Sequence, residues 1–406
     1  SALNSLVDGD TLLIPSNKYK ITKKLSCNQS NITIKGAGSK TILLYEYEQQ
    51  LKDQLRENSL LVFEEGVQNI TLKNFTVKYL GTFDTGGTYT GLISGIVFKG
   101  YCENILIEGV EATGFNREGI AFATNSSINF AKNVKVTKCN LHHNRVAGLW
   151  FQNSETVSVL ENDCSYNGLE SDDQTGYGIS FQGTNDGTPN YSKVINNKCS
   201  YNYRKGIDYH AGMNAIIEYN ICHGNKIVGI FAYGNRCENI SVKNNIISGM
   251  NTNPASRSII CAIHIGKSSG KPMVESPFYV IEGNKIYDIN QTTTEGNIIR
   301  IGMNLKQGLV SMKNNTINAN GISSICQIRD LPQKYSNVMV DISNNDIAVD
   351  VCNSNNPFIV AGSLINFSNN RITMNASKAK ILPGYIGNIV NWPANLKQIK
   401  CMNNFI

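Results

Sequence analysis

One segment of the sequence brings a lysine, a carboxylate and an imidazole together within six residues. Residues 205–210 read Lys-Gly-Ile-Asp-Tyr-His. Acids, bases and cations are the groups that general acid–base chemistry uses. In an extended strand Asp208 and His210 project to the same side. This segment is therefore the first candidate for a catalytic site.

Similar segments recur along the chain, each with a glycine followed by alternating apolar and variable residues. Alternation with a period of two is typical of a strand with one buried face. Stacking these strands places the variable residues in two adjoining outward columns. The first column holds Ala121, Trp150, Ser180, Asp208, Phe231, His264 and Arg300. The second column holds Ala123, Gln152, Gln182, His210, Tyr233, Gly266 and Gly302.

The columns predict a carbohydrate-binding groove. Outward aromatic side chains usually mark a binding surface, and their flat rings suit sugar rings. Amide and acid groups are available for sugar hydroxyls. The residues expected to bind substrate are Trp150, Gln152, Gln182, Tyr209, Phe231, Tyr233, His264 and Arg300. The alternative for the aromatic residues is a contact between subunits.

The amino-acid composition indicates the class of protein and the partners that it is expected to bind. Hydrophobic residues make up 41% of the chain and charged residues 17%, with 35 glycines, which favours a folded, turn-rich β protein. The 37 basic and 31 acidic residues are spread along the chain, so neither a nucleic-acid partner nor a membrane patch is predicted. There is no apolar run long enough to span a bilayer and no signal-peptide pattern. Because the chain starts at Ser1, we expect it to begin inside a longer polypeptide.

A recurring asparagine predicts the architecture. Its intervals range from 23 residues (Asn197 to Asn220) to 39 residues (Asn245 to Asn284). A minimum period with variable extra length is typical of a solenoid whose coils carry inserted loops. We expect each asparagine to adopt a left-handed conformation and to bond to its equivalents in the neighbouring coils. The members are Asn162, Asn197, Asn220, Asn245, Asn284, Asn315, Asn345 and Asn370.

The first residues resemble a known family. Leu-Leu-Ile-Pro at 12–15, Tyr-Lys-Ile at 19–21 and Ile-Thr-Ile-Lys-Gly-Ala-Gly at 32–38 resemble the opening coils of pectate-lyase-like β-helix proteins, which include bacteriophage tailspike depolymerases. The resemblance implies an all-β fold, a right-handed single-stranded parallel β-helix with N- and C-terminal caps. It also implies a homotrimer at an extracellular or virion-tail location, acting on a bacterial capsule, exopolysaccharide or O-antigen.

The repeats suggest three segments. Residues 1–64 would form an N-terminal cap and first coils, with a short helix or loop at 46–59. Residues 65–375 would form the β-helix coils. Residues 376–406 would cap the strand edge that the last coil leaves exposed.

The segment 205–210 also resembles Tyr-Gly-Phe-Asp-Pro-His of mannuronan C5-epimerases. Asp208 and His210 match the acid and the histidine of that motif. Lys205 stands in place of its tyrosine and Tyr209 in place of its proline. Tyr177 stands one coil before Lys205 in the same column, which suggests a displaced tyrosine.

Elimination from a uronic-acid polymer is one possible reaction. It needs a base, an acid for the leaving oxygen and a cation against the carboxylate. His210, Tyr177 and either Lys205 or Arg204 would supply these groups.

Hydrolysis is the other possible reaction. It needs two carboxylates roughly 5 to 9.5 Å apart. Asp208 with Asp172 or Asp173 would supply them, with Glu118 and Glu170 in reserve. We therefore expect a polysaccharide depolymerase, lyase or hydrolase, and the alternatives are a non-catalytic adhesin and a uronan epimerase. Its expected catalytic residues are Asp208, His210, Asp173, Tyr177 and Lys205.

Neither a cofactor nor a metal is expected. The sequence lacks a phosphate-binding loop, a His-Glu-x-x-His motif and an Asp-rich calcium loop, and His142-His143 is interpreted as a solvated turn. The 11 cysteines include no Cys-x-x-Cys pair. Because Cys164, Cys199 and Cys222 each follow a repeat asparagine by two residues, we expect free, buried thiols, as in a protein folded in a reducing cytosol.

Overall fold

The computed structural model divides the chain into two compact units, Ser1–Asp208 and Tyr209–Ile406. We call them the N-terminal unit and the C-terminal unit. The residues that the structure describes are 2–47, 56–81, 93–123, 130–170, 174–183, 191–210, 212–250, 261–268, 274–290, 296–303, 307–322, 324–329, 337–350, 358–360, 364–374, 398–402 and 404.

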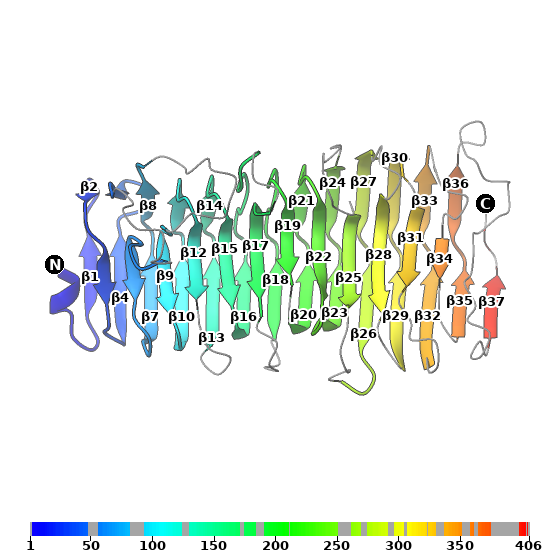
Figure 1. Cartoon of the computed structure of the whole chain (residues 1–406), viewed down its shortest axis with the longest axis horizontal. Helices are drawn as coiled ribbons and strands as arrows, with labels where there is room; N and C mark the ends of the chain where they lie inside the picture. The colour runs from blue at the N-terminus through cyan, green and yellow to red at the C-terminus, as the bar shows by residue number, and fades with distance from the viewer. Residues whose placement is uncertain are drawn as a thin grey trace. The chain divides into compact units, whose positions relative to one another are not determined.

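Strands β1 to β15 of the N-terminal unit join sheets A, B and C in turn, and β16 to β19 alternate between sheets A and C (Figure 1). Sheet A has the order β1 (Thr11–Ile14), β4 (Ile32–Gly36), β7 (Gln68–Lys73), β10 (Cys102–Glu108), β13 (Ala131–Thr137), β16 (Ser154–Leu160) and β18 (Ser192–Ile195). Sheet B has the order β2 (Asn17–Ile21), β5 (Thr41–Tyr45), β8 (Thr76–Tyr79), β11 (Glu111–Thr113) and β14 (Asn140–His142). Sheet C has the order β3 (Leu25–Cys27), β6 (Leu61–Phe63), β9 (Ile96–Lys99), β12 (Glu118–Ala123), β15 (Ala147–Gln152), β17 (Tyr177–Gln182) and β19 (Lys205–Tyr209). A short 3-10 helix, η1 (Ala2–Ser5), precedes them.

The C-terminal unit repeats this arrangement. Sheet A has the order β20 (Met213–Glu218), β23 (Glu238–Lys243), β26 (Phe278–Glu282), β29 (Gln307–Lys313), β32 (Asn337–Ser343), β35 (Leu364–Ser368) and β37 (Gln398–Met402). Sheet B has the order β21 (Ile221–His223), β24 (Ile246–Met250), β27 (Lys285–Asn290), β30 (Thr316–Gly321), β33 (Asp346–Val349) and β36 (Arg371–Met374). Sheet C has the order β22 (Val228–Gly234), β25 (Cys261–Lys267), β28 (Asn297–Met303), β31 (Ser324–Arg329) and β34 (Phe358–Val360). Residues 376–397 of the expected cap lie outside the described residues, and β37 pairs in parallel with β35.

Identical inward positions of successive coils stack on one another. In sheet C of the N-terminal unit the phenyl rings of Phe63, Phe98, Phe122, Phe151 and Phe181 form a continuous column, with centroids 4.5 to 4.8 Å apart. Parallel strands in register force this arrangement, because each residue lies beside its equivalent one coil away. The period-two pattern thus becomes the hydrophobic core.

The asparagine repeat forms the expected ladder inside each unit. Asn162 donates from its backbone N–H and its Nδ2 to Oδ1 of Asn197, at 3.0 and 2.9 Å. In the C-terminal unit the same pair of bonds, 2.8 to 3.2 Å long, runs from Asn220 through every later member to Asn404. The buried amides therefore satisfy one another.

The expected left-handed conformation of these asparagines is wrong. The positive φ belongs to the residue before each ladder asparagine, and it is 57° at Glu161, Asn196 and Tyr219. The turn therefore places the asparagine side chain inside the coil, where it bonds along the solenoid, while the preceding residue takes the strained backbone.

A second ladder was not predicted. Asn144 donates to Oδ1 of Asn167 and Asn167 to Oδ1 of Asn202, with backbone N–H bonds of 3.1 and 3.0 Å. The intervals of 23 and 35 residues repeat those of the first ladder, so the sequence did contain the signal. This ladder also explains the leading glycines of three neighbouring sheet C strands, Gly119, Gly148 and Gly178. A Cβ on Gly178 would lie 2.6 Å from the Gly206 oxygen and 3.0 Å from Nδ2 of Asn202.

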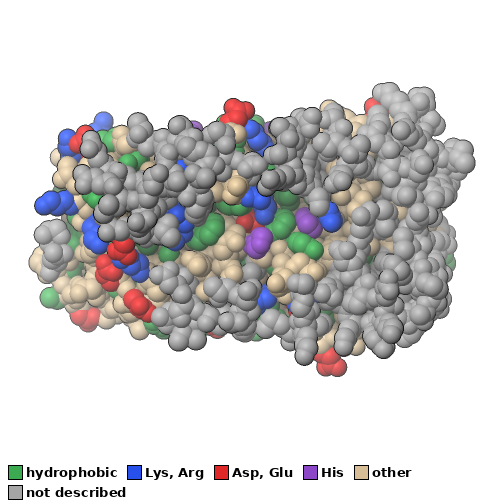
Figure 2. Space-filling view, viewed as in Figure 1, with side chains coloured by type: hydrophobic (Ala, Val, Ile, Leu, Met, Phe, Trp, Pro, Cys, Tyr) green, Lys and Arg blue, Asp and Glu red, His purple; other side chains and the backbone are tan. Residues whose placement is uncertain are grey.

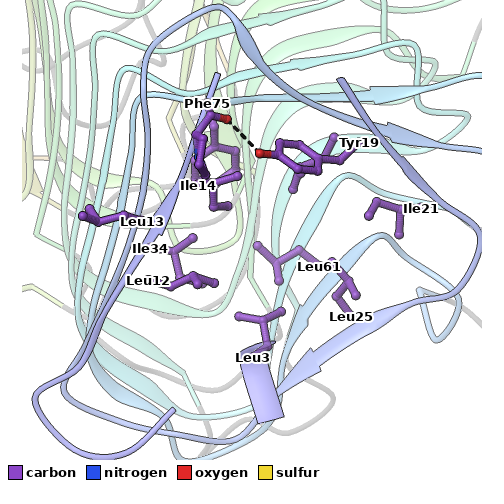
Figure 3. A pocket seen from close by; sticks show the side chains of 12 residues that line it. Leu3, Leu12, Leu13, Ile14, Tyr19, Ile21, Leu25, Ile34, Leu61 and Phe75 are labelled. Carbon is purple, nitrogen blue, oxygen red and sulfur yellow. Dashed lines mark hydrogen bonds between the residues drawn. The ribbon is translucent and has the colours of Figure 1, made fainter. Parts of the chain in front are cut away.

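The first coils of the N-terminal unit line an open apolar pocket of about 320 Å³ (Figure 3). Its lining includes Leu3 of η1, Leu12 and Ile14 of β1 and Leu25 of β3. The strands β1, β2 and β3 are the end strands of their sheets in this unit. The apolar interior of the solenoid therefore continues up to its first strands.

The nine cysteines whose environment is described are all free and buried, which confirms the expected thiols. Burial raises the pKa of the Cys102 thiol to about 12. In the described parts of the chain, no helix is both long enough and apolar enough to cross a bilayer.

Candidate functional site

The two outward columns of sheet C have the predicted register within each unit. In the N-terminal unit Ala121 pairs with Trp150 and Trp150 with Ser180, while Gln152 pairs with Gln182. In the C-terminal unit the first column holds Phe231, His264 and Arg300. The second column holds Tyr233, Gly266 and Gly302. Each unit therefore presents a polar and aromatic surface built from its own strands.

The expected exposure of this surface is wrong at several positions. Trp150, Phe231 and Tyr233 are half-buried rather than exposed, and Trp150 packs against Val146, Ala147 and Tyr177. Asp208 and Ser180 are fully buried, with 0% exposure. Their neighbours' side chains cover them, which a strand pattern does not reveal.

The Asp208 carboxylate is held by three side chains of the N-terminal unit. Lys205 Nζ donates to Oδ1 at 2.8 Å, and Gln182 Nε2 donates to Oδ2 at 2.9 Å. Ser180 Oγ donates to Oδ2 at 3.3 Å. Both charged side chains are buried, Lys205 at 7% and Asp208 at 0% exposure. Burial of the two charges is tolerable because they neutralise each other and are hydrogen-bonded.

Tyr177 lies beside Lys205, as expected from the column. Its hydroxyl donates to the Gln174 carbonyl at 2.8 Å and accepts from Arg204 Nη1 at 3.1 Å. The Arg204 guanidinium carbon and Lys205 Nζ lie 5.7 and 5.6 Å from the ring centroid, and the Trp150 ring lies 6.3 Å away. Two cations and one indole ring therefore surround the Tyr177 phenol. We call Trp150, Tyr177, Arg204, Lys205 and Asp208 the tyrosine cluster.

Tyr209 is not a surface residue, so its predicted role in binding substrate is wrong. The side chain has 0% exposure, and its hydroxyl donates to the Met213 carbonyl at 3.2 Å. The cause is the alternation itself, because a strand that turns Asp208 outward must turn Tyr209 inward.

The C-terminal unit carries an aromatic cluster with two histidines. His210 is exposed and its ring stacks on Phe231, with centroids 5.5 Å apart. Phe231 meets His264 edge-on at 5.1 Å, and Tyr233 stacks on His264 at 4.4 Å. Arg300 pairs with His264 in the first column. Aromatic side chains and imidazoles of this kind provide ring faces and proton-transfer groups.

Gly302 makes room for this cluster. A Cβ there would lie 2.3 Å from a ring carbon of Tyr233. The glycine in the second column is therefore part of the surface, because it lets the Tyr233 ring lie against the strand backbone. The sequence placed Gly302 in the column without indicating this contact.

The reserve acids differ in their surroundings. Asp172 and Asp173 lie outside the described residues, and Glu170 is exposed. Glu118 has 0% exposure and accepts from Arg56 Nε and Nη2 at 3.1 and 2.7 Å and from Arg117 Nε at 3.0 Å. Burial alone raises the pKa of Glu118, but Arg117, Arg56 and the Ser94 hydrogen bond together lower it to about 2. Glu118 is therefore a structural anion.

Among the described residues, no group of three or more His, Cys, Asp or Glu side chains is placed to hold a metal ion. His142 bonds to Glu111 through Nε2 at 3.1 Å and to His143 through Nδ1 at 2.7 Å. On the face drawn in Figure 2, histidine side chains lie beside hydrophobic and basic ones.

Comparison with known proteins identifies the fold. Residues 94–278 match the family described as "Right handed beta helix region". The predicted right-handed parallel β-helix is thereby confirmed. No curated protein sequence matches the chain.

Solved structures with similar folds differ strongly in sequence. The Agl-KA catalytic domain is 16% identical with a TM-score of 0.50, covering 100% of this chain and 63% of that one. The AlgE4 A-module of the Azotobacter vinelandii mannuronan C-5 epimerase is 13% identical with a TM-score of 0.49, covering 94% and 91%. The Dettilon tailspike protein gp208 is 14% identical with a TM-score of 0.46, covering 91% and 61%. At these identities the similarity concerns the fold.

Proposed function

We propose that the protein is a polysaccharide depolymerase that cleaves glycosidic bonds of a bacterial capsule, exopolysaccharide or O-antigen. The observation that carries the proposal is the tyrosine cluster. It joins a proton-transfer group, two cations, a buried carboxylate and an indole ring on the outward side of one sheet. A surface needed only for stability would not require this combination.

In this proposal Tyr177 transfers a proton at the scissile bond. The Arg204 guanidinium donates to the phenol oxygen at 3.1 Å. A cation at this distance stabilises the negative charge that develops when the hydroxyl gives up its proton. Asp208 fixes the position of Lys205, whose ammonium lies 5.6 Å from the Tyr177 ring centroid.

In this proposal the substrate is bound by side chains of the two outward columns of sheet C. Trp150 offers a ring face for a sugar, and Gln152 and Gln182 offer amides for hydroxyl groups. In the C-terminal unit we assign binding to Phe231, Tyr233, His264 and Arg300.

His210 is the proposed acid–base group of the C-terminal unit. It is exposed, and an imidazole exchanges protons near neutral pH. Cleavage by elimination would use it as the base. Cleavage by hydrolysis would need Asp173 as a second carboxylate for Asp208.

The test is incubation of the purified protein with isolated capsule, exopolysaccharide and lipopolysaccharide. We expect the viscosity of one of them to fall and new chain ends to appear. Unsaturated uronate ends indicate elimination, whereas new reducing ends without unsaturation indicate hydrolysis. Tyr177→Phe and His210→Ala should each reduce turnover by about a hundredfold.

Two results would overturn the proposal. Retention of a polysaccharide without fragments would identify a non-catalytic adhesin. A changed ratio of uronate epimers in a polymer of unchanged length would identify an epimerase.

The proposal includes a homotrimer at an extracellular or virion-tail location. Light scattering tests the assembly directly. A mass of one chain, 44.7 kDa, would contradict the trimer.

A further inference from the structure

Arg204 has a hydrogen-bonding edge that nothing in the described structure occupies. Its Nη1 donates to the Tyr177 hydroxyl at 3.1 Å and also to the Gln174 carbonyl. Its Nε is buried and has no partner. Among the described residues no carboxylate pairs with its guanidinium, in contrast to Lys205, which Asp208 neutralises. Within the described part of the chain, Arg204 is therefore a cation without a counter-charge.

Two other arginines of the chain show what such an edge binds. Arg56 donates from Nε and Nη2 to the two oxygens of Glu118, at 3.1 and 2.7 Å. Arg371 does the same to Asp346, at 2.9 and 2.6 Å. A guanidinium edge fits the two oxygens of a carboxylate, and the pairing is both charged and bidentate.

A second donor without a partner lies against the same phenol. The indole Nε1 of Trp150 is buried and makes no hydrogen bond, and the Trp150 ring lies 6.3 Å from that of Tyr177. An unsatisfied buried donor is costly, and native proteins rarely keep one without a reason. Two of them, Arg204 Nε and Trp150 Nε1, flank Tyr177.

We propose that the Nε and Nη2 edge of Arg204 binds the carboxylate of an acidic sugar, while Trp150 Nε1–H donates to an oxygen of the same sugar unit. The substrate class is thus a polysaccharide that contains uronate or a similar carboxylated sugar. This inference rests on the proposed function, because it assigns the substrate of the same cluster.

The charge distinguishes an acidic sugar from a neutral one. A hydroxyl group would satisfy one donor and leave the guanidinium charge uncompensated. A carboxylate satisfies both N–H groups of the edge and supplies the missing negative charge, and hydrogen bonds between charged groups are stronger than neutral ones.

The experiment uses the Trp150 indole as the reporter. The chain contains two tryptophans, so Trp392→Phe leaves a single indole N–H signal in a 1H–15N NMR spectrum. Methyl glycosides of glucuronate, galacturonate and mannuronate are titrated beside the matched neutral sugars glucose, galactose and mannose. At least one uronate should shift the indole signal, with a dissociation constant about tenfold or more below that of its neutral partner.

Variants assign the difference to Arg204. Arg204→Gln should remove the preference for the uronate, and Arg204→Lys should retain only part of it, because lysine keeps the charge and loses the bidentate edge. Lys193→Gln, which removes one exposed positive charge from β18, should leave the preference unchanged. The inference is overturned if no uronate is preferred, or if the preference survives Arg204→Gln.

The titration separates this inference from the proposed function. Cleavage of a neutral polysaccharide without any uronate preference would leave the depolymerase standing and refute the acidic substrate. A uronate preference without cleavage of any polysaccharide would support the acid-binding edge and refute the depolymerase.

Discussion

Two carboxylates of the N-terminal unit are equally buried and have different surroundings. Glu118 and Asp208 both have 0% exposure and both form ion pairs. Around Glu118 the Nε and Nη2 edge of Arg56 is occupied by the carboxylate. Beside Asp208 the same edge of Arg204 is left over, together with the Trp150 indole N–H. Burial of a charge therefore does not distinguish the two sites, and the unused donors beside Asp208 are the feature on which the proposed function of its site rests.

The largest expected effect comes from breaking the Glu118 site. Glu118→Gln removes the buried carboxylate that Arg56 and Arg117 share. Loss of one partner of a buried ion pair typically costs about 3–5 kcal/mol. Denaturant unfolding should show a loss of this size. Glu108→Gln, which breaks a surface pair with Lys73, is the control and should cost far less, because solvent screens surface ion pairs.

Asp208→Asn should destabilise somewhat less. The amide keeps an acceptor for Gln182, but the buried Lys205 loses its ion pair with the Asp208 carboxylate. We expect a loss of about 3 kcal/mol in the free energy of unfolding. A loss below about 0.5 kcal/mol would show that Lys205 finds water instead of remaining buried.

The ladder residue Asn220 gives the stability cost of losing a neutral buried group, for comparison with the two carboxylates. Asn220→Ala removes one member of the ladder and leaves Oδ1 of Asn245 without the two donors that Asn220 supplies at 2.8 and 3.0 Å. The expected cost is about 1–3 kcal/mol, below that of Glu118→Gln. Catalysis should persist. An unchanged melting temperature would show that the ladder does not stabilise the protein at this position.

The pH dependence of Glu118 tests the same ion pair without a mutation. Its pKa is lowered in the folded protein from 4.5 to about 2. A lowered folded-state pKa stabilises the protein above the unfolded-state value, and that stabilisation is lost as the pH falls from about 4.5 to 2. Unfolding measured across this window should show stability decreasing toward acid. Glu118→Gln should decrease less steeply, and equal slopes would contradict the assignment.

Much of the fold followed from the sequence because each coil repeats the same contacts. The asparagines that form the first ladder recur at the spacing of a coil, and a leading glycine such as Gly178 marks where the second ladder approaches the strand. The left-handed residue was misplaced because its identity varies, as Glu161 and Tyr219 show. Alternation gave the register of the outward columns for the same reason.

The site was harder to predict because it depends on side chains that reach across strands. The period-two alternation correctly predicted that Asp208 points outward. It did not indicate that the Lys205 and Gln182 side chains bury Asp208. Tyr209 was assigned to the surface against the alternation that the same segment displays. The free edge of Arg204 is a property of hydrogen-bond geometry, and no spacing in the sequence reveals it.

The central claim is that the Asp208 site is functional and the Glu118 site structural. The most direct measurement compares turnover of Asp208→Asn and Glu118→Gln on a cleaved polysaccharide, at a temperature where both variants are folded. We predict a loss of at least about a hundredfold for Asp208→Asn and a change within about threefold for Glu118→Gln. Near-normal turnover of Asp208→Asn, or an equal loss in both variants, would contradict the account.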